Sequence, residues 1–117
     1  MKYVDGFVLP IPVKNLPAYR KMASLAGAIW REHGALQYVE CAGEDLTIEG
    51  TLPFPVLTGA GDADTVVFAF IVYESREHRD EVNRKVMADP RLNDMGEEMP
   101  FDVKRMAYGG FEVIVEE

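Results

Sequence analysis

Apolar side chains dominate four short segments of the chain, residues 2–11, 35–41, 65–73 and 106–115. Each segment is rich in β-branched and aromatic residues, a composition that predicts strands. The third, Thr-Val-Val-Phe-Ala-Phe-Ile-Val-Tyr, is apolar at nearly every position, so we expect both faces of this strand to be covered. Pro10 and Pro12 are expected to end the first strand, because proline cannot donate to a ladder of hydrogen bonds.

Two stretches between these strands carry apolar residues at spacings of three and four, the period of a helix. In the first stretch Asn15 is a candidate N-cap, Pro17 suits the first turn, and Gly34 suits the position after the last turn. The apolar stripe of this helix comprises Leu16, Tyr19, Ala23, Ala26, Trp30 and His33, widened by Ala18, Met22, Leu25 and Ile29.

The second predicted helix begins after a cap at Ser75 and runs to about Ala88, before Pro90. Its buried side is expected to comprise Val82, Val86 and Met87. The resulting order, β-α-β-β-α-β, predicts an α+β, ferredoxin-like domain with two helices on one face of an antiparallel sheet. Nothing in the sequence is left to cover the other apolar face, so we expect a second subunit to pack there and form a homodimer.

Residues 43–63 show little periodicity and are interrupted repeatedly by glycine and proline. Loops of this length are uncommon in compact domains and are often functional. We therefore interpret the segment as a lid over a binding site, with disorder as the simpler alternative.

Several short motifs along the chain are distinctive: residues 3–8 (Tyr-Val-Asp-Gly-Phe-Val), 34–36 with 39–41, 89–91, 99–102, and 104–106 with 108–112. Together they resemble the YbaA-like family, a bacterial family of unknown function placed in the dimeric α/β-barrel superfamily. The resemblance implies a homodimer in which two sheets form one barrel. The resemblance implies no particular catalytic residues. The superfamily includes cofactor-free monooxygenases, isomerases, haem enzymes and ligand-binding modules, so the fold alone does not indicate the function. Residues 51–64 depart from the family's pattern.

The charge of the chain narrows the classes of partner. The 117 residues include 12 Lys and Arg against 20 Asp and Glu, a net charge of −8. A nucleic-acid binder needs a concentrated basic face, so we expect no nucleic-acid partner. No apolar run approaches the roughly 20 residues of a membrane span, so we expect no membrane partner and a cytoplasmic location. The length suits one domain over residues 1–117.

Three residues are candidates for catalysis. Asp5 lies inside an apolar strand, where a buried carboxylate is a candidate general base unless it pairs with a basic residue such as Arg105 or meets backbone N–H groups. His78 is expected on the sheet-facing side of the second helix, either as a proton shuttle or as a partly buried histidine with one backbone hydrogen bond. Tyr108 is expected to face the same cavity as Asp5 and to donate a hydrogen bond.

Further residues are candidates for binding a small molecule in a pocket between the sheet and the helices. Aromatic side chains would line it, unless they simply fill the core, and Glu40 and Arg105 would supply charge. These candidate ligand-binding residues are Trp30, Tyr38, Glu40, Phe68 and Arg105.

Metal and cofactor chemistry are not expected. The two histidines, His33 and His78, lack the close spacing of paired metal ligands, and Cys41 is the only cysteine. A lone cysteine on a strand is more often a small buried hydrophobe than a nucleophile. A single cysteine also excludes a framework of disulfide bonds. We therefore predict neither a metal site nor a cofactor.

Two functions fit these patterns. The first is a small-molecule enzyme of the cofactor-free monooxygenase or isomerase kind, with a water-excluding pocket between sheet and helices. The second is a non-catalytic homodimeric module that binds a small ligand or only assembles. A packed interior in which every carboxylate has a partner would overturn the first.

Overall fold

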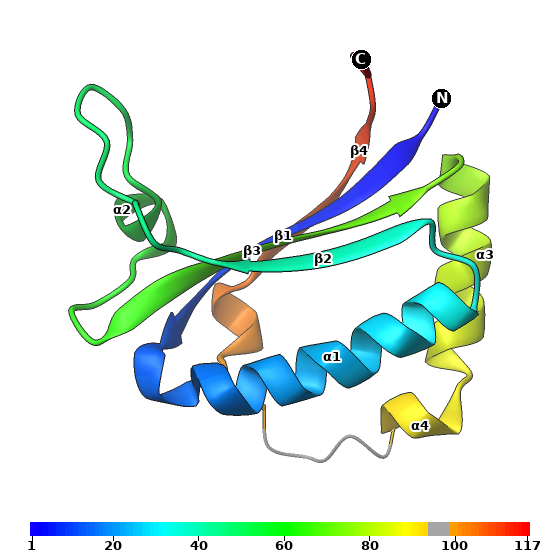
Figure 1. Cartoon of the computed structure of the whole chain (residues 1–117), viewed down its shortest axis with the longest axis horizontal. Coiled ribbons are helices and arrows are strands. Elements are labelled where there is room, and N and C mark those ends of the chain that lie inside the picture. Colours follow the sequence, from blue (N-terminus) through cyan, green and yellow to red (C-terminus); the bar gives the residue numbers. More distant parts are fainter. Residues whose placement is uncertain (94–98) are drawn as a thin grey trace.

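The computed structural model describes residues 1–93 and 99–117. Within these residues, one antiparallel sheet contains four strands in the order β2-β3-β1-β4 (Figure 1). In chain order the elements are β1 (Tyr3–Pro12), α1 (Leu16–Glu32), β2 (Gln37–Ala42), α2 (Phe54–Thr58), β3 (Asp64–Tyr73), α3 (Arg76–Met87), α4 (Pro90–Asn93) and β4 (Ala107–Glu112). The predicted α+β class and the order of its two main helices and four strands are confirmed.

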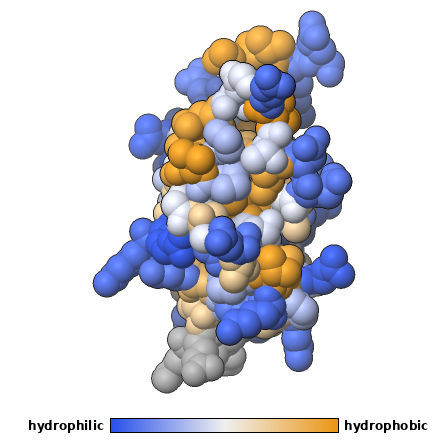
Figure 2. Space-filling model, turned by 90° about the vertical axis from the view of Figure 1, so that its left-hand side faces the viewer, coloured by the Kyte–Doolittle hydropathy of each residue, from blue (hydrophilic) through white to orange (hydrophobic). Residues whose placement is uncertain are grey.

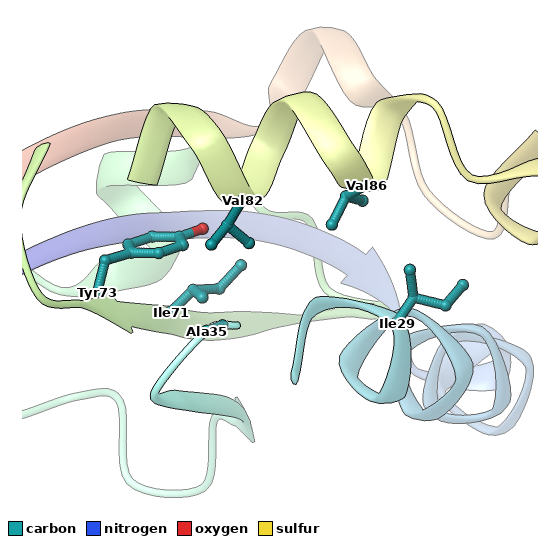
Figure 3. Close-up of a cluster of buried hydrophobic side chains, with 6 residues drawn as sticks. All are labelled: Ile29, Ala35, Ile71, Tyr73, Val82 and Val86. Carbon is teal, nitrogen blue, oxygen red and sulfur yellow. The ribbon is translucent and has the colours of Figure 1, made fainter. Parts of the chain in front are cut away.

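The main helices α1 and α3 pack on one face of the sheet. One core cluster joins Ile29 of α1, Val82 and Val86 of α3, and Ile71 and Tyr73 of β3 (Figure 3). Because successive residues of a strand point to opposite faces, the odd-numbered residues of β1 and β3 face the helices and the even-numbered ones face away.

The first strand is longer than predicted, because Pro10 and Pro12 do not end it. Both prolines lie within β1 and pair with Val66 and Asp64 of β3. The reason is positional: β4 pairs with β1 only as far as Val8. The missing N–H groups of the two prolines therefore face an edge without a neighbouring strand, where proline costs no ladder hydrogen bond.

Both main helices start close to the predicted positions, but by different means. The Oγ of Ser75 accepts a hydrogen bond from the backbone N–H of His78, which confirms the predicted cap of α3. Asn15 precedes α1 without capping it, since its side-chain nitrogen donates to the carbonyl of Pro100 instead. Three side chains predicted on the apolar sides of the two helices are exposed, because they lie outside the narrow arcs that face the sheet: Ala18 and Leu25 of α1 and Met87 of α3.

The other predicted boundaries shift by a few residues. Strand β2 begins at Gln37 rather than residue 35, and β4 ends at Glu112 rather than residue 115. Residues 43–63 are not structureless, because α2 (Phe54–Thr58) lies within them, and Pro90 begins the short helix α4 instead of only ending α3.

The sheet face opposite α1 is only partly covered. Helix α2 lies on that side (Figure 1) and contacts β1 and β3. Phe68 and Phe111 point to the same side and remain 45% and 62% exposed. Figure 2, which faces the end of the molecule near α2, shows apolar side chains exposed among charged ones. Among the described helices, none has both the length and the apolar character that a membrane span requires.

Candidate functional site

A glutamate lies between two tyrosines where α1 meets the edge strand β2. The hydroxyl of Tyr19 donates to Oε1 of Glu40 at 2.6 Å, and the hydroxyl of Tyr38 donates to Oε2 at 2.7 Å. Hydrogen bonds of this length to a charged acceptor are among the stronger ones in proteins. The carboxylate is thus held in a fixed position by both elements.

The close approach of α1 to β2 depends on Gly27. Tyr38 and Glu40 are two residues apart on β2, so both point to the helix-facing side of the sheet. The ring of Tyr38 lies directly against the helix backbone at Gly27. A Cβ atom at that position would lie 2.7 Å from Cδ1 of Tyr38, closer than real contacts allow. Glycine is therefore the residue that lets the Tyr38 ring, and with it Glu40, lie under α1.

The two tyrosines are neutral donors at physiological pH. Burial raises the pKa of Tyr19, and the hydrogen bond to Glu40 raises it further. Burial also raises the pKa of Tyr38, with the negative charge of Glu40 as the next cause. A phenol with a raised pKa keeps its proton, so the pair presents two O–H donors to one carboxylate.

Two adjoining cavities lie next to Glu40 and its two tyrosines. The larger, of about 770 Å³, lies between α1 and β2, and the smaller, of about 320 Å³, lies between α1 and the interior of the sheet. Both fall in the usual size range of small-molecule sites. The residues that line both cavities are Tyr19, Ala23, Tyr38 and Glu40. The smaller cavity adds apolar walls from Phe7, Met22, Trp30, Phe101 and Met106.

A second polar cluster surrounds Asp5, whose side chain is 1% exposed. Arg79 of α3 donates from Nη1 to Asp5 at 3.2 Å and to the hydroxyl of Tyr108 at 3.2 Å. Its guanidinium also lies 5.0 Å from the centre of the Tyr3 ring. Burial opposes the charge of Arg79, but Asp5 and Tyr108 outweigh it and hold the pKa of Arg79 above its usual value.

The structure brings two of the three candidate catalytic residues together. Asp5 and Tyr108 both accept a hydrogen bond from Arg79. Arg79 was not among the residues predicted from the sequence. The signal was present, because Arg79 precedes the buried Val82 and Val86 by three and seven residues and so shares their side of the helix.

Arg105 was considered as the partner of Asp5 and as a ligand-binding residue, and the structure places it elsewhere. Its Nη2 donates to the carbonyl of Gly59 at 2.6 Å, and its Nη1 lies 3.8 Å from Asp64. Arg105 thus ties the segment after α2 to the start of β4. It lines neither of the two cavities.

The third candidate, His78, does not join the Asp5 cluster. Its Nδ1 accepts a hydrogen bond from the backbone N–H of Glu74 at 3.0 Å, and its ring packs edge-on against Tyr73. The arrangement matches the alternative of a partly buried histidine with one backbone hydrogen bond.

The candidate ligand-binding residues divide between the two faces of the sheet. Trp30, Tyr38 and Glu40 all line the smaller cavity. Phe68 was expected with them but lies on the opposite face, because it is an even-numbered residue of β3. Tyr19, which completes the site, was assigned to the apolar stripe of the first helix, and its hydroxyl was not considered.

Among residues 1–93 and 99–117, no group of three His, Cys, Asp or Glu side chains is placed to hold an ion. Cys41 is exposed rather than buried, contrary to its interpretation as a small core residue.

The amino-acid sequence of the chain is similar to a family of known proteins. Residues 2–103 match the family described as "Protein of unknown function (DUF1428)". Over 117 residues, the full length of both chains, the sequence is 48% identical to the uncharacterized protein YbaA of Escherichia coli (strain K12). It is equally similar, over the same length, to the proteins of that name from Escherichia coli O157:H7 and Shigella flexneri.

Proposed function

The chain belongs to the DUF1428 family, and from its geometry we propose that it binds a small, largely apolar molecule in the two adjoining cavities between α1 and the sheet. The observation that carries the proposal is the carboxylate of Glu40, which is held by two neutral tyrosines and faces both cavities.

Glu40 has acceptor capacity left for a ligand. An ionised carboxylate offers about four lone-pair sites, and the two tyrosines occupy one on each oxygen. A group that donates a hydrogen bond, such as a hydroxyl or a protonated amine, would use the remaining sites. The apolar body of the ligand would then contact Phe7, Met22 and Trp30 in the smaller cavity.

Titration with benzylamine tests the proposal, because the probe combines a small apolar ring with a protonated amine. In two-dimensional ¹H–¹⁵N spectra we expect saturable shifts of the amides of Ala23, Tyr38 and Glu40. Glu40→Gln should weaken binding about tenfold or more, the range expected for a hydrogen bond to a charged group. Glu49→Gln, which removes a charge from an exposed site outside both cavities, should not. Equal binding by the Glu40→Gln variant, or the absence of saturable shifts, would reject the proposal.

Catalysis at Asp5, His78 and Tyr108 gains no support from the cavities. None of these three residues is among those that line either cavity. Asp5 is paired with Arg79, and His78 with a backbone amide. We therefore assign Asp5 the role of anchoring α3 to the sheet. The proposed ligand site is at Glu40, and we propose binding there but no catalysis.

We also propose that two ferredoxin-like copies of the chain pair through the open face of the sheet. The support is the apolar surface that Phe68 and Phe111 leave exposed there, opposite the face that α1 and α3 cover. A monomer of this size rarely leaves a continuous apolar sheet face in water. A second copy fits because it presents the same apolar face, as a two-fold interface requires.

Sedimentation velocity tests the pairing. We expect the mass of two chains for the protein and for Leu25→Asp, a control on the exposed side of α1. Phe68→Asp and Phe111→Asp should each shift the population toward one chain. A folded wild-type protein that sediments as a single chain at micromolar concentration would rule out the pairing.

A further inference from the structure

The proposed ligand site has a cation on its rim, and we infer, resting on the proposed function, that the ligand carries an anionic group such as a carboxylate, which Arg20 binds. The ligand class is therefore a small aromatic or aliphatic acid that also bears an amine or hydroxyl group. Its donor would meet Glu40, and its acid group would meet Arg20.

The helix wall of the larger cavity carries both positive charges of the site. Among the α1 residues that line the cavity, Pro17, Arg20, Ser24, Gly27 and Arg31 recur at spacings of three and four. Arg20 and Arg31 are eleven residues apart, about three turns, so they lie on the same side of the helix. Two guanidinium groups thus line a cavity to which Glu40 is the only acidic residue contributed by the described part of the chain.

The two arginines differ in what they already bind. Arg31 donates from Nη1 to the carbonyls of Ala35 and Leu36, and so fixes the turn between α1 and β2. Within residues 1–93 and 99–117, the side chain of Arg20 makes neither a hydrogen bond nor an ion pair. In a chain with 20 acidic and 12 basic residues, such a cation beside a cavity is available to an anion.

Charge explains why the ligand needs both groups. A simple anion would be repelled by Glu40 and by the net charge of −8. A simple cation would be attracted to Glu40 but would leave Arg20 unused. Glu40 and Arg20 both line the larger cavity, so one acidic and one basic group border the same space. A molecule with a donor at one end and an acid at the other satisfies both.

Three substituted benzenes separate these cases: benzylamine, 4-(aminomethyl)benzoate and p-toluate. They share one ring and differ only in their charged ends. We expect 4-(aminomethyl)benzoate to bind about fivefold more tightly than benzylamine, as one partly exposed ion pair provides, and p-toluate to bind most weakly. Arg20→Gln should remove the advantage of 4-(aminomethyl)benzoate while benzylamine binds at least as well as before. Lys21→Gln is the matched control, since it removes one positive charge from the neighbouring exposed position.

The outcomes distinguish the inference from the function on which it rests. If benzylamine binds through Glu40 but the added carboxylate gives no advantage, the assignment of Arg20 is wrong and the proposed function stands. If Lys21→Gln weakens 4-(aminomethyl)benzoate as much as Arg20→Gln does, the effect belongs to net charge and the assignment is again wrong. If none of the three probes binds, the proposed function itself fails.

Discussion

Arg79 on α3 donates to Asp5 in the interior strand β1 at 3.2 Å, and the carboxylate that it reaches is almost completely buried. The pair lies at the opposite end of the interface between α3 and the sheet from Val86. Burial of a carboxylate is costly unless a cation is paired with it, and Arg79 supplies that cation.

The first prediction follows from this pair. Arg79→Met keeps most of the side-chain volume but leaves Asp5 without its cation, so we expect the free energy of unfolding to fall by about 3–5 kcal/mol. The double variant Asp5→Asn with Arg79→Met should lose less than the single one, because the uncompensated charge is gone. Urea denaturation followed by circular dichroism gives both values.

Arg84→Met is the matched control for this experiment. Arg84 lies on the same helix, and its ion pair with Glu81 is exposed to solvent. Exposed pairs contribute little to stability, so this variant should unfold close to the wild-type midpoint. Equal midpoints for Arg79→Met and Arg84→Met would mean that the Asp5 pair does not anchor α3.

The second prediction concerns Gly27. In most helices a change from glycine to alanine stabilises the protein, by up to about 1 kcal/mol. Here the new Cβ would lie 2.7 Å from the Tyr38 ring, so we expect a loss of about 1–3 kcal/mol instead. In a Tyr38→Ala background the clash is absent, and Gly27→Ala should then be neutral or stabilising. A stabilising effect of Gly27→Ala in the wild-type background would show that the ring moves away at no cost.

The fold was largely predictable from local signals. Strand β3 follows from a run of β-branched and aromatic residues, and α3 follows from the cap at Ser75 and the spacing of Val82 and Val86. These signals depend on neighbours within one turn or one strand. The boundary at Pro10 failed because it depends on where a different strand, β4, stops pairing.

The candidate site was less predictable, because it depends on pairs far apart in sequence. Glu40 was identified from its strand, but its two phenol partners come from residues 21 positions before and two positions before it. A hydroxyl at the end of an apolar ring fits a core stripe and a polar site equally well, so Tyr19 was assigned to the core. Phe68 was misplaced for a simpler reason, since composition does not say which face of a strand points to the helices.

The third prediction is a loss of stability in acid that depends on Asp89. Hydrogen bonds from Arg91 and then from His33 hold the pKa of Asp89 well below its usual value of about 4. A carboxyl whose pKa is lower in the folded chain stabilises it at neutral pH, and that stabilisation is lost as the pH falls below about 4. Asp89→Asn should therefore be less stable at pH 7 and show a flatter decline of unfolding free energy between about pH 5 and pH 2.

Asp45→Asn provides the comparison for this acid titration. Asp45 is an exposed carboxylate to which the described part of the chain contributes no ion pair. Its variant should follow the wild-type decline of the unfolding free energy. Parallel curves for Asp89→Asn and the wild type would mean that the Arg91 and His33 contacts do not hold the carboxylate in solution.

The fourth prediction uses the tyrosines of the site at alkaline pH. Burial and the neighbouring Glu40 raise the pKa of both Tyr19 and Tyr38 in the folded chain. Above the unfolded-state pKa of about 10, the unfolded chain releases these protons and the folded chain keeps them, so stability falls as the pH rises. Tyr38→Phe removes one such proton and should make the fall shallower by about 1.4 kcal/mol per pH unit. Chemical denaturation between about pH 10 and pH 12 measures the two slopes, and identical slopes would mean that the Tyr38 hydroxyl is open to water rather than held against Glu40.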